Sequence, residues 1–160
     1  MASRTFHIHP LKPSDRPWVS RFMIDRWGAL TVVSRGRVHQ PDELPGFVAL
    51  QGDNPVGLAT YRIEGDECEL VTIDSLVEGM GIGTALIEAV RQAAEGCRRL
   101  WLITTNDNTP ALRFYQKRGF TLAALHRNAL EQSRKLKPEI PLIGMDGIPI
   151  RDEIELEMLL

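Results

Sequence analysis

Residues 67–95 read ECELVTIDSLVEGMGIGTALIEAVRQAAE. The part up to Leu76 is rich in β-branched residues and favours a strand. A turn with glycines at 79, 81 and 83 follows, and apolar residues then recur at helical spacing until Gly96 ends the helix. The N–H groups of a first helical turn lack helical partners, and glycines let a phosphate approach the backbone. The stretch therefore predicts an anion-binding turn.

The spacing of these glycines excludes two common nucleotide-binding turns. A P-loop requires a lysine after its last glycine, and none follows Gly83. A dinucleotide fingerprint requires G-x-G-x-x-G, but Thr84 or Leu86 stands where the last glycine belongs. Residues 78–83 instead resemble R/Q-x-x-G-x-G/A, the pyrophosphate turn of the GNAT superfamily of acetyl-CoA-dependent N-acetyltransferases. Glu78 departs from that pattern, because the superfamily has Arg or Gln there.

A second motif supports the same resemblance. Residues 106–120 read NDNTPALRFYQKRGF and are similar to the superfamily's N-x-x-A-x-x-F-Y-x-x-x-G-F. One helix and one strand, Arg99–Thr104, separate the two motifs, as the superfamily requires. The resemblance is close over residues 45–126 and holds in outline beyond them. Six residues match in register: Asn108, Ala111, Phe114, Tyr115, Gly119 and Phe120.

The resemblance implies one α/β domain over residues 1–160. Its sheet would be mixed and mostly antiparallel, with six or seven strands, helices on both faces and two central parallel strands splayed around the cofactor. The sequence pattern adds an N-terminal helix from Ser14 to Gly28, an irregular segment over 29–44 and a short helix within 127–149. The predicted strands cover residues 5–9, 46–51, 56–63, 67–76, 99–104, 120–126 and 153–158.

Composition excludes several classes of function. The 160 residues carry a net charge of −2, whereas nucleic-acid modules usually have a basic surplus. No apolar run approaches the roughly 18 residues of a membrane helix, and no apolar signal core precedes residue 10, so a cytoplasmic location without membrane contact is expected.

His7 and His9 have no clustered partners, so no metal is expected. Cys68 is expected to be a small buried filler and not a nucleophile.

The resemblance assigns roles to the matching residues. Acetyl-CoA would be the donor, and its carrier arm would pair with the backbone of Val71, Thr72 and Ile73. Asn108 would hydrogen-bond the pantetheine arm, and Tyr115 would protonate the leaving sulfur. The pyrophosphate would lie on Gly79, Met80, Gly81, Ile82, Gly83 and Thr84.

The base is a separate question. Strand alternation places Glu67, Glu69, Val71 and Ile73 on one face and Cys68, Leu70, Thr72 and Asp74 on the other. Glu67 matches the position at which some members of the superfamily have a base. Glu69, Asp74 or a chain of waters are the alternatives.

The sequence thus predicts an N-acetyltransferase that moves acetyl to a primary amine by direct attack. The acceptor would be a small molecule or a protein amine, and a homodimer is left open as the assembly. A rival hypothesis is a non-catalytic acyl-CoA-binding sensor or partner module, and another is transfer of a longer acyl chain. Arg35, Arg37 and His39 are candidates for holding an anionic group of the acceptor, and Trp27 is expected to pack in the core.

Overall fold

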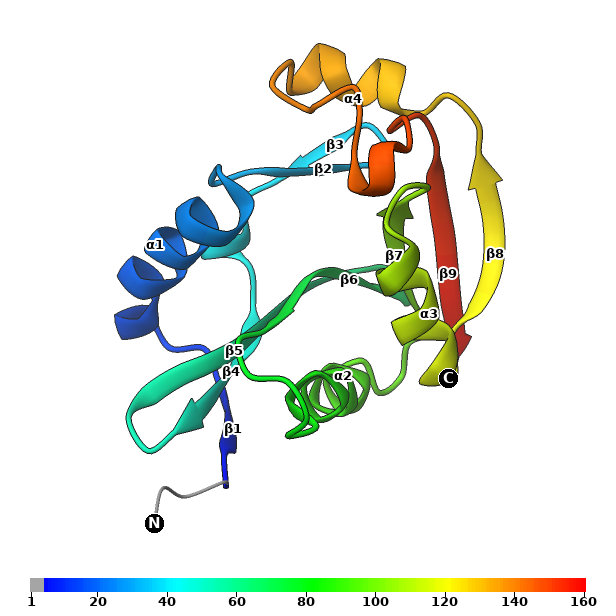
Figure 1. The fold of residues 1–160 in the computed structure, drawn as a ribbon. Coiled ribbons are helices and arrows are strands. Elements are labelled where there is room, and N and C mark those ends of the chain that lie inside the picture. Colours follow the sequence, from blue (N-terminus) through cyan, green and yellow to red (C-terminus); the bar gives the residue numbers. More distant parts are fainter. Residues whose placement is uncertain (1–4) are drawn as a thin grey trace. The chain divides into compact units, whose positions relative to one another are not determined.

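A computed structural model describes residues 5–160, and the chain forms two compact units (Figure 1). The first unit contains the described residues 5–30 and 40–100 with Leu160, and the second contains 31–39 and 101–159. Seven strands form one mixed sheet in the order β1-β4-β5-β6-β7-β9-β8, with β6 and β7 parallel. The predicted α/β GNAT-like fold is confirmed. The single domain over 1–160 stays a prediction.

The first unit is built on four antiparallel strands. They are β1 (His7–Pro10), β4 (Gly46–Gln51), β5 (Asn54–Glu64) and β6 (Glu67–Ser75). Tight turns join β4 to β5 and β5 to β6, and each uses a glycine with positive φ, Gly52 and Gly65. Both hairpins join strands that the sequence predicts.

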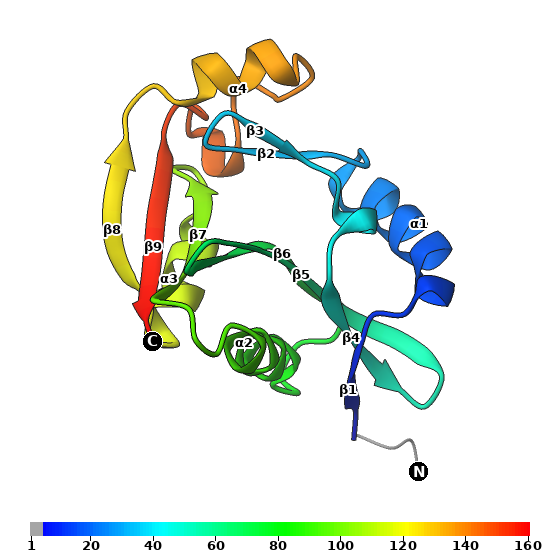
Figure 2. The same ribbon diagram turned by 180° about the vertical axis from the view of Figure 1, so that it is seen from behind.

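Helices α1 (Arg16–Trp27) and α2 (Ile82–Ala93) lie on opposite sides of these strands, as Figures 1 and 2 both show. A β-carbon added to Gly57 would lie 2.6 Å from Ile82, so α2 packs directly on the backbone of β5. Helix α1 begins later than predicted. Residues Pro13–Asp15 form a 3₁₀ turn, η1, and Asp15 precedes the helix, so the predicted start at Ser14 is wrong.

A β-bulge changes which side chains of β6 share a face. Thr60 pairs with Thr72 and Tyr61 pairs with Leu70, so Val71 is an extra residue in β6. Glu67 and Glu69, opposite Glu64 and Arg62, therefore lie on the same face as Thr72 and Asp74. Strict alternation predicted the opposite grouping, and that prediction is wrong. The α1 side of β6 thus presents three carboxylates, while Cys68 and Leu70 lie on the other face and are buried.

The second unit contains the other elements. The hairpin β2 (Val32–Ser34) and β3 (Arg37–His39) occupies the segment predicted to be irregular, and the 3₁₀ turn η2 (Pro41–Glu43) follows in the first unit. Strand β7 (Arg99–Thr105) starts in the first unit and leads to α3 (Thr109–Lys117). Strands β8 (Thr121–His126) and β9 (Glu153–Leu159) pair antiparallel, and between them lie α4 (Leu130–Leu136) and the turn η3 (Met145–Gly147).

Polar side chains anchor the long excursion between β8 and β9. Asn106 accepts hydrogen bonds from the backbone of Arg151 and Asp152 and donates to the Pro149 carbonyl. Asp107 is buried and accepts from the backbone N–H of Met145 at 3.1 Å. Residues directly before α3 therefore fix a segment about forty positions further along the chain.

Candidate functional site

The glycine turn before α2 has the backbone conformation of an anion cradle. Gly79 and Gly81 adopt φ values of 79° and 77°, a region that side chains other than glycine rarely enter. Ile82 begins the helix, and the first helical hydrogen bond runs from the Ala85 N–H to the Gly81 carbonyl. The N–H groups of residues 82–84 therefore precede the helical ladder and face out of its positive end. The space beside both glycines is open, since a β-carbon there would have no atom within 4 Å.

Glu78 is exposed at the edge of this turn. An exposed carboxylate is hydrated, and the positive end of α2 is a favourable place for it. The departure from the family pattern is therefore compatible with an anion on the other side of the turn.

The bulge in β6 lies within the predicted carrier-arm segment. Val71 is the extra residue, and Thr72 and Ile73 follow it back into register with Thr60 and Ala59. An extra residue leaves its own backbone groups out of the ladder with β5. Backbone groups that are unpaired in this way can hydrogen-bond an extended ligand such as the predicted carrier arm.

In the second unit, Asn108 and Tyr115 are both on α3. Asn108 caps the helix, because its side-chain oxygen accepts the Ala111 N–H at 3.2 Å. Any contact with a ligand would then use its amide N–H donors. Tyr115 is half-buried, and its ring packs edge-on against buried Phe120 and against Phe114, at 5.6 and 5.4 Å between ring centroids. These contacts fix the direction of the phenol.

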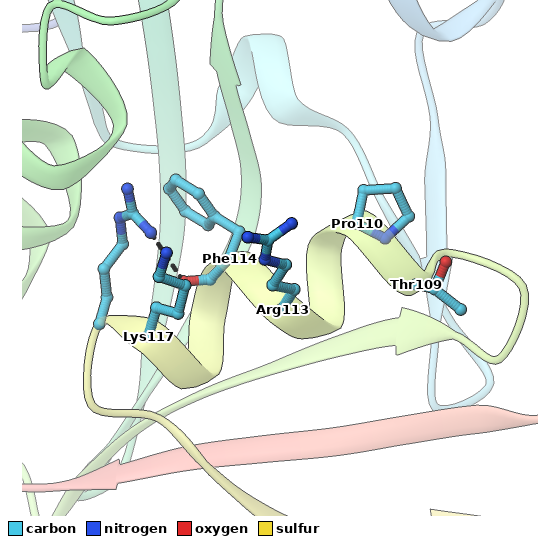
Figure 3. Close-up of a pocket in the computed structure, with 6 residues that line it drawn as sticks. Thr109, Pro110, Arg113, Phe114 and Lys117 are labelled. Atoms are coloured by element: carbon cyan, nitrogen blue, oxygen red, sulfur yellow. Dashed lines mark hydrogen bonds between the residues drawn. The ribbon is translucent and has the colours of Figure 1, made fainter.

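Helix α3 also lines a basic pocket that sequence reasoning missed. The pocket has a volume of about 510 Å³, and the side chains of Pro110, Arg113 and Phe114 project to one side of the helix (Figure 3). The Arg118 guanidinium lies 3.8 Å from the centre of the Phe114 ring. Two cations of α3, Arg113 and Lys117, and the C-cap residue Arg118 make this pocket basic. The sequence feature that could have predicted this pocket is the i, i+4 spacing of Arg113 and Lys117, which places both cations on the same side of the helix. The lining residues are Thr109, Pro110, Arg113, Phe114, Lys117 and Arg118.

The candidate bases of β6 have different environments. Glu67 has one oxygen, Oε1, that accepts from Nε of Arg99 at 2.8 Å and also from Arg98. Glu69 is buried opposite Arg62. Asp74 accepts from the indole Nε1 of Trp27 at 2.8 Å. Burial raises the pKa of Asp74 to about 6, although the Trp27 hydrogen bond and the charge of Arg26 lower it.

Other predicted candidates have structural partners. Arg35 forms a 3.1 Å ion pair with the buried Glu153, and His39 is buried 2.8 Å from the Ser34 hydroxyl. Burial raises the pKa of Cys68 to about 12, so this cysteine stays a thiol and is a poor nucleophile. Trp27 is 39% exposed and does not pack in the core, contrary to expectation.

Among residues 5–160, no three His, Cys, Asp or Glu side chains gather in a way that could hold a metal ion. In the same described range, none of the helices has the length and apolar character needed to cross a membrane.

The fold and the two motifs are those of the GNAT family. Residues 9–120 match the Acetyltransferase (GNAT) family, and the chain belongs to that family. It is 49% identical to the uncharacterized protein YxbD of Bacillus subtilis, over 92% of this chain and 95% of that protein. It is also 34% identical to the peptidyl-lysine N-acetyltransferase YjaB of Salmonella typhimurium, over 63% of this chain and 66% of that protein.

Solved structures agree on the fold. The IAA acetyltransferase from Bacillus cereus superposes with a TM-score of 0.74 at 22% identity, covering 98% of this chain and all of that one. A GNAT family acetyltransferase from Elizabethkingia anophelis, solved with acetyl-CoA bound, gives 0.68 at 23% identity, covering 97% and 98%. Structural neighbours of this chain thus bind acetyl-CoA.

Proposed function

We propose that this chain transfers an acetyl group from acetyl-CoA to a primary amine by direct attack. The main support is the glycine turn, in which two left-handed glycines open the first turn of α2 to an anion. The bulge at Val71, within the segment Val71–Ile73 assigned to the carrier arm, adds one residue that has no partner in the β5 register. Residues 79–84 would receive the pyrophosphate.

The cations of α3 suit the other phosphate of the cofactor. Coenzyme A carries a phosphate on its ribose as well as the pyrophosphate, and Arg113 and Lys117 line the basic pocket. Asn108, on the same helix, would donate its amide N–H groups to the pantetheine arm. All of these contacts bind and orient the donor and leave the reacting bonds to other groups.

The reaction breaks one bond and forms one. The amine nitrogen attacks the thioester carbon, the C–N bond forms, and the C–S bond breaks with the electron pair leaving on sulfur. Tyr115 would give its phenolic proton to that sulfur, so coenzyme A leaves as a thiol. The amine must lose a proton to a base, and two carboxylates of β6 compete for that role: Glu67 by its family position and Asp74 by its environment.

The test is a screen of amine acceptors with the purified chain and acetyl-CoA. A lysine-containing peptide with a blocked N-terminus, a lysine-free peptide with a free N-terminus, and spermidine represent the main amine types. We expect one of them to release thiol in equal amount to the acetylated product, identified by mass spectrometry. Calorimetric binding of acetyl-CoA with no turnover on any amine would instead favour the non-catalytic acyl-CoA-binding module.

A further inference from the structure

The C-terminal end of α1 contacts the end of β6 through a hydrogen bond. Trp27 is the last residue of α1, and its indole Nε1 donates to Oδ2 of Asp74 at 2.8 Å. Arg26 lies farther away, with 3.9 Å between its NH2 nitrogen and Oδ1. The indole is 39% exposed and therefore lies at the edge of the packed interior. Its hydrogen bond also fixes the orientation of the Asp74 carboxylate.

Asp74 follows directly on the segment assigned to the carrier arm. Its side chain is 13% exposed, and it lies on the α1 face of β6 with Thr72. The Thr72 hydroxyl is hydrogen-bonded to Thr60 at 2.7 Å, and neither threonine is a base at neutral pH. Among the side chains of β6 on this face, the carboxylates are the groups that can accept a proton from an amine.

The three carboxylates on this face differ in how their charge is balanced. Oε1 of Glu67 accepts from two guanidinium groups, and Glu69 is buried opposite Arg62. Asp74 has a neutral donor on one oxygen, and Arg26 is at the limit of ion-pair distance from the other. Asp74 thus has less charge compensation than Glu67 and keeps a lone pair available.

We propose that Asp74 is the catalytic base that takes the proton from the acceptor amine, and that Trp27 is the residue that positions it. The inference rests on the proposed function and names its proton acceptor. The base would act directly or through one water, and the same carboxylate would attract a cationic amine to this face. Glu67 then has a structural role, holding the start of β6 to Arg98 and Arg99.

The environment of Asp74 agrees with that role. Its pKa of about 6 leaves it ionised at neutral pH and close to the value that favours proton transfer. Among the described residues of the first unit, the neighbours of Asp74 come from α1, β5 and β6. Arg26 and Trp27 come from α1, its cross-strand partner Leu58 is uncharged, and Glu69 is the nearest other carboxylate along the same face of β6.

The protonation of Asp74 can be followed in the absence of an acceptor amine. The chain has three tryptophans, and the indole N–H resonance of Trp27 is identified in a ¹⁵N-correlated spectrum by its absence in Trp27→Phe. We expect this resonance to move with pH around a midpoint near 6 in the wild type and to be flat in Asp74→Asn. Asn keeps an oxygen that accepts the indole N–H, so the variant should keep the contact and the fold.

The role in catalysis is read from kcat/KM against pH on the peptide or spermidine that the screen identifies. We expect an ascending limb with the same midpoint as the indole titration. Asp74→Asn should lower kcat/KM by about 10²-fold or more and remove that limb. Trp27→Phe and Arg26→Gln each remove a group that lowers the pKa of Asp74, so both should shift the limb to higher pH. Trp18→Phe and Arg21→Gln, elsewhere on α1, should leave it in place.

The outcomes separate the two proposals. Asp74→Asn could keep a near-normal kcat/KM and the ascending limb while losing the indole titration. That result would overturn the role of Asp74 and leave acetyl transfer standing. Loss of the limb in Glu67→Gln alone would move the role to Glu67. A wild-type chain that acetylates none of the amines would overturn the proposed function itself, and with it this assignment.

Discussion

Replacing Gly81 by Asp tests the anion cradle most directly. The added β-carbon meets no atom within 4 Å, so the variant pays no steric penalty, and the left-handed φ of 77° costs about 1–2 kcal/mol of folding stability. A carboxylate at the N-terminal end of a helix stabilises the fold by about 0.3–1 kcal/mol. The net destabilisation should therefore be about 1 kcal/mol.

The same carboxylate should oppose the cofactor strongly. It would occupy the place of the pyrophosphate, and two like charges 4 Å apart repel by about 1 kcal/mol in water and about 4 kcal/mol near a protein surface. We expect the dissociation constant of acetyl-CoA to rise by about 10- to 10³-fold. Calorimetric titration at low and high salt measures it, and the loss should shrink at high salt, because the Debye length falls from about 10 Å at 0.1 M to about 3 Å at 1 M.

Gly96→Asp is the matched control. Gly96 follows the other end of α2, its φ is 92°, and the space beside it is also open. An acid there meets the negative end of the helix, so this variant should lose more stability than Gly81→Asp and still bind acetyl-CoA normally. Equal affinity in the two folded variants would refute the assignment of the turn before α2 as the pyrophosphate site.

Four other perturbations have clear expected outcomes. Tyr115→Phe should lower kcat by about 10²-fold in steady-state assays and leave the calorimetric dissociation constant of acetyl-CoA unchanged, because a general acid acts in the transition state. Glu78→Gln should change that dissociation constant by less than about threefold, since the carboxylate is exposed; a tenfold tightening would show that it faces the phosphates. The double variant Arg113→Gln, Lys117→Gln should weaken acetyl-CoA binding by about tenfold and reduce its salt dependence, with no loss in thermal stability. Asp74→Asn should be more stable than the wild type at pH 8. Folding raises the pKa of Asp74 from 3.8 to about 6, so the wild type loses folding stability as the pH rises from 4 to 6. The loss is about 2–3 kcal/mol at most. Urea unfolding at pH 4 and pH 8 checks it, and an advantage of equal size at both pH values would contradict the reasoning.

The parts of the fold that local physics determines were predictable from the sequence. The glycines at 79 and 81 could be recognised because a strand, a turn and a helix start coincide there, and each component has its own residue preference. The motif over residues 106–120 is equally local, and it contains both Asn108, which caps α3, and the helix itself. These features depend on residues within a few positions of one another.

Features that depend on long-range contacts were not predictable. The hairpin β2–β3 is only three residues per strand, and it turns at Arg35 and Gly36, both with positive φ. Arg35 is held there by Glu153, which lies 118 positions away in the sequence. Likewise, a tryptophan on an apolar helix is expected in the core until the structure places Asp74 within hydrogen-bond distance of it. No local pattern contains that information.

One inserted residue explains why the base was hardest to predict. Alternation along a strand assigns faces correctly only while the ladder is regular, and the extra residue at Val71 reverses the grouping on one side of it. Once the register is known, Glu67, Glu69 and Asp74 lie on a single face, and their surroundings can be compared directly. Asp74 then stands out because its charge costs folding stability at a position where the amide of Asn would keep the Trp27 hydrogen bond. A group that destabilises the fold where a neutral isostere would fit indicates a chemical role, since function is the usual compensation for such a cost.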